Sequence, residues 1–356
     1  MTGYETPPTH TSEVKIAMET GEAVLEIIDL RVHFKVHEGL LKAVDGVDLT
    51  LARGESLGLI GESGCGKSVA MQSLLRLEPS YAIVSGQITL NRSDGSIDLM
   101  QLEASGKEMR AIRWGEISMI FQEPMKAFSP IHSVGAQVIE ALLLHRVKDR
   151  AQAREIAISL FRKVGISNPE QRIDQYPHQL SGGMRQRVMI AMALSCTPTI
   201  LIADEPTTAL DVTVQAEVLE LIRSLQKEFG ISMIFITHDL GVIAEMSDQV
   251  AVMYLGKIVE QCDVDTLFYN PLHPYTVALL QSIPEISKPP RTELDTIDGS
   301  VPVPLNTGEG CGFYARCPHA IGGLCDVKTP EMTQAAAGHQ VRCFLKQNGA
   351  DTEVRV

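Results

Sequence analysis

One stretch of the chain combines glycines with a lysine and a serine at the spacing that phosphate binding requires. The pattern G-x-x-x-x-G-K-[ST] is met by Gly61, Glu62, Ser63, Gly64, Cys65, Gly66, Lys67 and Ser68. Glycines let the backbone bend so that successive N–H groups point at phosphate oxygens. We predict a nucleotide-binding loop, with Lys67 at the β- and γ-phosphates and the Ser68 hydroxyl on Mg²⁺. The alternative is a chance glycine turn with a solvated lysine.

Two carboxylates follow an apolar run later in the chain. Asp204 and Glu205 come directly after residues 199–203. Such a run predicts a strand, and open α/β sheets bind ligands at the carboxyl ends of their strands. We expect Asp204 to hold Mg²⁺ and Glu205 to orient or deprotonate the water that attacks the γ-phosphate. The alternative for Glu205 is a solvated acid at a strand end.

The hydrophobic pattern predicts the elements that must position these residues. Helices are expected at 68–77, 134–144, 151–164, 183–195 and 212–229, and strands at 24–28, 44–51, 56–60, 199–203, 232–236 and 249–254. Strands that alternate with helices favour a largely parallel sheet between helical layers. We therefore predict an α/β fold, a P-loop ATPase core around a mixed sheet.

Changes in composition along the chain predict its domain organisation. Residues 1–23 are polar and rich in Thr and Glu, so we expect a flexible leader there. An ATPase domain is expected over 24–285, with an inserted helical subdomain at about 123–195. Residues 286–346 are rich in Pro, Gly and Cys and predict a small C-terminal Cys-rich metal-binding domain, followed by a tail at 347–356.

Composition argues against several classes of protein, although a local basic patch could persist within an acidic total. The 356 residues hold 31 Lys and Arg against 44 Asp and Glu, a net charge of −13, so we expect no nucleic-acid partner. No apolar run approaches the roughly 20 residues that span a bilayer. The polar N-terminus does not resemble a secretory signal, so a cytoplasmic location is expected.

A third motif, Leu180-Ser-Gly-Gly-Met-Arg-Gln186, closely resembles the signature of ATP-binding-cassette (ABC) ATPases. The serine and the glycine amides at a helix start can form a second anion cradle. The resemblance implies that the cradle acts in trans, on ATP held by a partner subunit. The residues concerned are Ser181, Gly182, Gly183 and Gln186. Ser181 as an ordinary helix cap is compatible with this role.

Other positions match the ABC family in order along the chain. Gln122 resembles the Q-loop glutamine, which approaches Mg²⁺ and the attacking water and touches the transport partner. Asp211, in Ala209-Leu-Asp211, resembles the D-loop at the dimer interface, and His238 resembles the switch histidine that contacts the γ-phosphate. Phe34 is the candidate for stacking on adenine. The alternatives are a capping role for His238 and a core position for Phe34.

The amino-acid sequence of residues 203–213, and especially of 270–280, resembles that of the oligopeptide/dipeptide (nickel) importer branch of the family. The resemblance implies an ATP-hydrolysing subunit that pairs with a second ABC ATPase. It also implies two transmembrane permease subunits, an extracytoplasmic solute-binding protein, and a position on the cytoplasmic face of the plasma membrane. Peptides are the expected solute, with oligosaccharides and nickel chelates as alternatives.

Four cysteines lie near the C-terminus, separated by 5, 7 and 17 residues: Cys311, Cys317, Cys325 and Cys343. Four thiolates can hold a tetrahedral Zn²⁺ or an iron–sulfur cluster, and the close pairs typical of zinc ribbons are absent. The spacing also resembles a cysteine set that carries a [4Fe-4S] cluster in peptide-importer ATPases. We expect such a cluster in a structural or regulatory role. Zinc, free thiols, and His319 or His339 as a substitute ligand remain alternatives.

Cys65 stands where the loop often has Ser, and an exposed thiol beside Lys67 would have a lowered pKa and react with alkylating agents. A soluble cassette ATPase acting on DNA or ribosomes is a rival, and it predicts two cassettes in one chain or a basic arm. A redox-sensing regulatory protein is another, and it predicts that cluster oxidation changes turnover several-fold.

Overall fold

The computed structural model describes residues 21–208, 210–283, 297 and 299–347. Several sequence predictions therefore fall on residues that are not described. They are most of the leader at 1–23, Ala209 of the D-loop motif, the domain boundary at 285/286 and all but the first residue of the tail at 347–356. Within the described part of the chain, no helix has the length and apolar composition needed to cross a bilayer.

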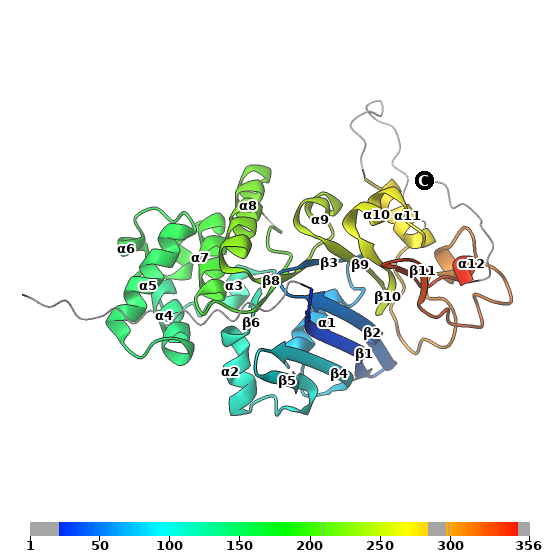
Figure 1. Ribbon diagram of the computed structural model, residues 1–356, viewed down its shortest axis with the longest axis horizontal. Helices are drawn as coiled ribbons and strands as arrows, with labels where there is room; N and C mark the ends of the chain where they lie inside the picture. The colour runs from blue at the N-terminus through cyan, green and yellow to red at the C-terminus, as the bar shows by residue number, and fades with distance from the viewer. Residues whose placement is uncertain (1–20, 209, 284–296, 298, 348–356) are drawn as a thin grey trace, which may run out of the picture.

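The larger sheet has eight strands in the order β11-β12-β10-β9-β3-β8-β7-β6 (Figure 1). Pairing is parallel from β9 through β3, β8 and β7 to β6, and antiparallel from β9 outward to β11. The predicted α/β fold with a mixed sheet is confirmed. The strands are β3 (Ser56–Ile60), β6 (Ile117–Ile120), β7 (Ile200–Asp204), β8 (Ser232–Ile236), β9 (Gln249–Tyr254), β10 (Lys257–Asp263), β11 (Thr333–Ala336) and β12 (His339–Val341).

The central strands are buried along their whole length, which explains why they are continuous apolar runs rather than alternating ones. Every residue of β3, β6, β7 and β8 is buried. Strands covered by helices on both faces need apolar side chains at every position. The helices that cover them include α1 (Lys67–Leu74), α8 (Val212–Phe229) and α9 (Leu240–Met246).

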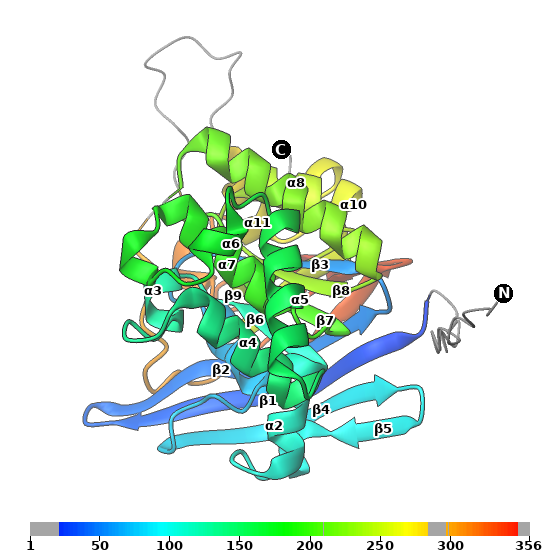
Figure 2. The ribbon, with the colours of Figure 1, turned by 90° about the vertical axis from the view of Figure 1, so that its left-hand side faces the viewer.

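A smaller antiparallel sheet lies beside the larger one, with strand order β2-β1-β4-β5 (Figure 2). Its strands are β1 (Ala23–Val36), β2 (Gly39–Ala52), β4 (Ala82–Arg92) and β5 (Gly95–Asp98). The strands predicted at 24–28 and 44–51 are present but extend further. One apolar core joins the two sheets, because Leu49 and Ile88 belong to the same buried cluster as Leu57 and Ile202.

Helices from the middle of the chain gather at one end of the molecule (Figures 1 and 2). They pack around a buried cluster that includes Val138, Leu142, Phe161 and Met189. Polar N-caps begin three of them, since Ser133, Asp149 and Ser181 each accept a hydrogen bond from a first-turn amide. The helices are α3 (Pro124–Ala127), α4 (Val134–His145), α5 (Arg150–Lys163), α6 (Pro169–Arg172) and α7 (Gly182–Leu194). The preceding helix, α2 (Lys107–Gly115), lies beside the smaller sheet (Figure 1), and its buried residues Met109 and Ile112 belong to the core shared by the two sheets.

The C-terminal part of the chain is attached to the larger sheet. Three short helices, α10 (Val264–Tyr269), α11 (Pro274–Gln281) and α12 (Phe344–Gln347), accompany the β11–β12 hairpin. The hairpin adds to the sheet through β12, which pairs with β10. We call residues 299–347 the Cys-rich segment. Its hairpin continues the ATPase sheet, although sequence alone suggested a separate small unit.

Candidate active site

The phosphate-loop motif joins the end of β3 to the start of α1. Both flanking glycines adopt positive φ, 150° at Gly61 and 107° at Gly66. A Cβ at Gly61 would lie 2.1 Å from the Met253 carbonyl oxygen, and one at Gly66 would lie 2.1 Å from that of Ala43. Only glycine fits either position, because the loop packs directly on the neighbouring backbone. Ser63 and Gly64 form the exposed tip of the loop.

Lys67 lies inside this loop. Its side-chain ammonium donates to the carbonyl oxygens of Gly61 at 2.6 Å and Glu62 at 3.1 Å, and the residue is only 6 % exposed. A buried ammonium at the first turn of a helix is well placed to neutralise a phosphate. Glu62, which the sequence also places in the ATP-binding loop, has protein partners in this structure. Its amide donates to Tyr275, and its carboxylate binds Arg316.

The expectation of a reactive thiol at Cys65 is wrong. Cys65 is 1 % exposed, and burial raises the pKa of its thiol despite the nearby Lys67 ammonium. The Sγ lies 3.6 Å from the Lys67 Nζ. The lysine does favour the thiolate, but burial in a low-dielectric environment outweighs that attraction.

Ser68 and Asp204 meet at the carboxyl ends of β3 and β7. The Ser68 hydroxyl donates to the Asp204 carboxylate at 3.0 Å. Burial raises the pKa of Asp204, which is 3 % exposed, and the charge of Glu205 raises it further. A pocket of about 390 Å³ opens beside them and is lined by Ser68, Gln72, Phe121, Gln122, Glu123, Lys126, Ala127 and Asp204. It contains all three predicted Mg²⁺ ligands, which offer hydroxyl, amide and carboxylate oxygens, the ligand type that Mg²⁺ prefers.

Three side chains converge on Glu205. Its Oε2 accepts hydrogen bonds from the Gln122 side-chain amide and the Thr208 hydroxyl, both at 2.9 Å, and its Oε1 lies 3.2 Å from His238 Nδ1. Sheet topology explains the convergence, because β6, β7 and β8 are parallel neighbours and their carboxyl ends lead into Gln122, Glu205 and His238. Thr208 was missed by the sequence analysis, although it stands in the quoted run 203–213.

The backbone and charge state of Glu205 suit a fixed carboxylate. Its φ is 45°, a strained value for a residue with a side chain, and its amide donates to the Ile236 carbonyl at 2.9 Å. Burial raises the pKa of Glu205, but hydrogen bonds from Thr208 and His238, with the charges of His238 and Lys67, hold it below its ordinary value. Glu205 is therefore ionised at neutral pH.

The signature motif lies at the exposed start of α7. Ser181 accepts a hydrogen bond from the Met184 amide at 3.3 Å, and both it and Gly182 are exposed. Gly183 is half-buried, whereas Gln186 is only 3 % exposed, so its side chain faces the interior rather than a partner. Asp211 is exposed and caps α8. Within the described residues, no hydrogen bond links these positions to the phosphate loop or to Glu205.

Phe34 lies on β1, half-buried against the core shared by the two sheets. Its ring centroid is 5.9 Å from that of Tyr81, which is 65 % exposed. The two rings form an aromatic pair at the molecular surface, and Tyr81 was not noticed in the sequence. Adenine stacking on Phe34 stays a prediction.

The four cysteines of the Cys-rich segment lie near one another. Burial raises the thiol pKa of Cys317 to about 11 and that of Cys343 to about 12, and nearby thiols contribute to both rises. The amide of Cys311 donates to the Cys325 carbonyl at 2.7 Å. A tetrahedral zinc site would hold its sulfurs roughly 3.8 Å apart, given Zn–S bonds of about 2.3 Å. Among the described residues, no three of these thiols lie within 4.8 Å of one another.

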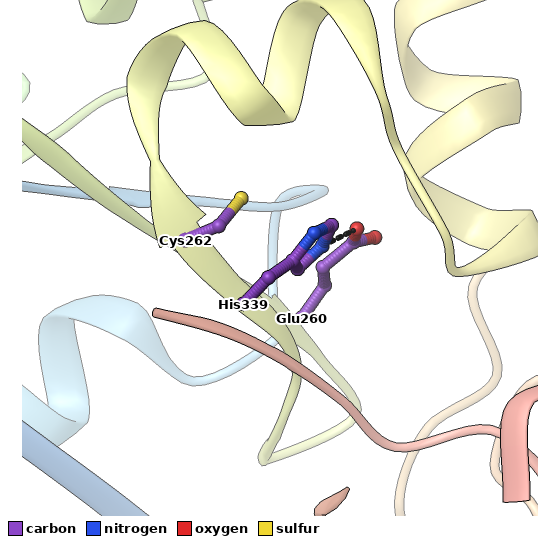
Figure 3. Close-up of side chains that lie close together, drawn as sticks. All are labelled: Glu260, Cys262 and His339. Carbon is purple, nitrogen blue, oxygen red and sulfur yellow. Dashed lines mark hydrogen bonds and ion pairs between the residues drawn. The ribbon is translucent and has the colours of Figure 1, made fainter. Parts of the chain in front are cut away.

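In the described part of the chain, one group of possible metal ligands has ligand atoms that all lie within 4.8 Å of one another: Glu260, Cys262 and His339 (Figure 3). The Glu260 carboxylate already accepts hydrogen bonds from the amides of Leu272 and His273, at 2.7 and 2.9 Å, and lies 2.8 Å from His339 Nε2. Burial raises the pKa of the Cys262 thiol, which disfavours the thiolate that a metal needs. The group therefore acts as a polar contact that fastens the hairpin to β10.

Comparison with known proteins decides the family. The family described as ABC transporter matches residues 44–208, and the oligopeptide/dipeptide transporter C-terminal region matches 259–325. The chain is 46% identical over 325 residues to a probable peptide ABC transporter ATP-binding protein, y4tR, of Sinorhizobium fredii, covering 91% of this chain and 95% of the relative. The chain belongs to the ABC transporter ATP-binding proteins. It is also 47% identical to the dipeptide transport ATP-binding protein DppD of Bacillus subtilis, covering 94% and 98% of the two chains.

Solved structures show the same cassette fold. A dimeric post-hydrolysis state of the ATP-binding cassette MJ0796, bound to ADP and Pi, aligns with a TM-score of 0.59 at 25% identity, covering 67% of this chain and 98% of that one. The cassette cbiO1 of Clostridium perfringens aligns with a TM-score of 0.56 at 28% identity, covering 70% and 92%. ABC transporter ATP-binding proteins are ATPases, and this chain is the ATPase of a transporter.

The first prediction concerns Glu205 in this ABC ATPase. Glu205→Gln keeps the shape of the side chain but removes the charge that orients and activates water. We expect ATP binding to be retained and hydrolysis to fall about 100-fold or more, measured as phosphate release at saturating ATP. Glu220→Gln, an exposed change on α8, is the matched control and should hydrolyse ATP at the normal rate. Unchanged turnover in the Glu205 variant would remove this residue from the mechanism.

Proposed function

We propose that this chain is the ATP-hydrolysing subunit of a peptide importer, held on the cytoplasmic face of the plasma membrane by permease subunits. The observation that carries the proposal is the convergence of Gln122, Thr208 and His238 on Glu205, beside the Ser68–Asp204 pair. Such an arrangement suits hydrolysis of a bound nucleotide. The relatives named for peptide and dipeptide transport supply the solute class.

In the proposed reaction each residue has one task. Lys67 neutralises charge on the β- and γ-phosphates, and Glu205 orients the attacking water and accepts its proton. His238 and Gln122 hold the Glu205 carboxylate and contact the γ-phosphate region. Ser68, Asp204 and Gln122 would hold Mg²⁺, which supplies positive charge to the phosphate oxygens when bound.

The proposal includes a second ABC ATPase subunit. Ser181 and Gly182 present an exposed helix start, with amide donors and a serine hydroxyl, and among the described residues they form no hydrogen bond with this chain's own phosphate loop. A cradle of this kind completes a site only when another chain approaches it. MJ0796, which shares the fold, is dimeric in its ADP-bound structure. Asp211 and the 84 % exposed Val212 lie on the surface proposed to join the two subunits.

Two transmembrane permease subunits and an extracytoplasmic solute-binding protein complete the proposed complex. Gln122 is followed by the exposed apolar side chains of Met125 and Ile131, which are 44 % and 75 % exposed. Gln122 contacts the nucleotide site, and the exposed apolar residues that follow it could bind a membrane partner. A conformational change at the nucleotide site could therefore be passed to that partner. The charge of −13 gives no support to a cassette ATPase acting on nucleic acid.

The second prediction is that the chain assembles with membrane subunits. Expressed with its neighbouring genes and purified in detergent, it should bring down two permease proteins and a second ATPase. Mass spectrometry of the binding protein's ligand should then find a peptide. An oligosaccharide or a nickel chelate would correct the solute only. If the chain purifies alone, or together with ribosomes or DNA, the proposal that it is a subunit of a peptide importer is contradicted.

We further propose that the four cysteines hold a [4Fe-4S] cluster, with His319 and His339 outside the ligand set. Neighbouring thiols contribute to the raised pKa of Cys317 and of Cys343, yet among the described residues no three of the four thiols lie as close together as a zinc site requires. Four such thiolates suit the larger cluster. His339 is already engaged with Glu260. A bound cluster would stabilise a segment that is poor in secondary structure, and nothing in ATP hydrolysis requires electron transfer.

The third prediction tests the metal directly. Protein purified without oxygen should contain about four irons and an equal amount of sulfide per chain. Cys317→Ser should lose most of this iron and lower the melting temperature of the Cys-rich segment. Cys196→Ser, at a buried thiol that lies against the Ala141 carbonyl of α4, should keep the iron. About one zinc per chain, or no metal in the wild-type protein, would contradict the cluster.

A further inference from the structure

An arginine of the Cys-rich segment binds directly to the phosphate loop. Arg316 precedes Cys317, and its two terminal nitrogens donate to the two carboxylate oxygens of Glu62 at 2.8 and 3.1 Å. Two parallel N–H···O bonds between ionised groups form the strongest type of side-chain contact and fix both position and orientation. The Arg316 side chain is 6 % exposed and that of Glu62 is 28 % exposed, so water reaches the pair mainly from the Glu62 side.

The same loop residue is held from a second direction. The Glu62 amide donates to the Tyr275 hydroxyl at 2.9 Å, and Tyr275 packs against Tyr254 with ring centroids 4.6 Å apart. Phe313, three residues before Arg316, completes this aromatic group. Arg316 also donates to the Tyr254 hydroxyl at 3.4 Å. Glu62 is thus held by a group of packed side chains that come from α11, β9 and the Cys-rich segment.

Arg316 itself stands on a segment that is anchored elsewhere. Asn306 exchanges hydrogen bonds with the backbone of Leu40 at 2.8 and 2.9 Å, next to the β1–β2 turn. At the other end, the β12 hairpin pairs with β10, and His339 meets Glu260. Because the chain on both sides of Arg316 is hydrogen-bonded to the rest of the ATPase, the position of Arg316 relative to the phosphate loop is fixed.

We propose that Arg316 is a positioning residue for ATP binding, which holds Glu62 so that the phosphate loop keeps its binding conformation. The pair also cancels a carboxylate charge that would otherwise repel the triphosphate. A loop ordered before the nucleotide arrives loses less conformational freedom on binding, which favours affinity. This role requires only that the chain is an ABC ATPase, and it depends neither on the peptide substrate nor on the proposed cluster.

The fourth prediction is a loss of ATP affinity without an equal loss of chemistry. Arg316→Gln leaves the Glu62 carboxylate unpaired, and we expect the Kd and KM for ATP to rise about tenfold. The kcat at saturating ATP should stay within about twofold, because Glu205, Gln122 and His238 are untouched. Arg316→Lys keeps the charge but loses the paired geometry, so a rise of about threefold is expected. Binding is measured with a fluorescent ATP analogue on the full chain.

A double variant separates positioning from general damage. Glu62→Gln removes the charge left by Arg316→Gln, so the double variant should bind ATP more tightly than Arg316→Gln alone, and the two effects should not add. Arg162→Gln, which breaks the exposed Arg162–Glu170 ion pair of the helical part, is the matched control and should leave the Kd unchanged. If Arg316→Gln does not fold, Arg316→Lys decides. A folded Arg316 variant with wild-type ATP affinity, or additive effects in the double variant, would overturn the proposal.

Discussion

Parallel pairing of β6, β7, β8 and β3 is the constraint on which the whole site depends. Parallel neighbours end at one edge of a sheet, so segments far apart in the sequence are brought together there. The Q-loop, the Glu205 turn, the switch histidine and the phosphate loop each follow one of these strands. The same pairing requires both faces of the strands to be buried, which accounts for the apolar runs that precede each motif.

A second consequence of the sheet concerns the Cys-rich segment. Its hairpin extends the sheet on the side of β10, and the loop before the hairpin reaches back to the phosphate loop. The segment therefore packs against the cassette in addition to holding a small core of its own at Val341, Cys343 and Leu345. The nucleotide loop in turn contacts the segment through Glu62. The Cys-rich segment is therefore a part of this ATPase, outside the sequence motifs of the cassette, that contacts the nucleotide-binding loop directly.

The sequence predicted the α/β fold and the strands that lead into the motifs, because each motif is a short run with its own local requirement, such as glycine at positive φ or an acid after a buried strand. Burial of individual side chains was harder to foresee. Cys65 and Gln186 are both buried. The residues around each of them in the sequence do not indicate whether the side chain is buried or exposed. The contact between Glu62 and Arg316 joins residues 254 positions apart and has no local signal at all. Thr208 contacts Glu205 across a turn in which Glu205 has a positive φ, and that conformation is not evident from the local sequence.

The most direct test of this account is ATP hydrolysis by the complete transporter in lipid vesicles. The complex to be reconstituted is the proposed one, with this chain, a second ATPase, two permease subunits and a solute-binding protein. Hydrolysis should rise when the binding protein carries a peptide, labelled peptide should accumulate in the compartment that faces the ATPase subunits, and Lys67→Ala should abolish both. Hydrolysis that is indifferent to peptide and permease, with no peptide movement, would contradict the account.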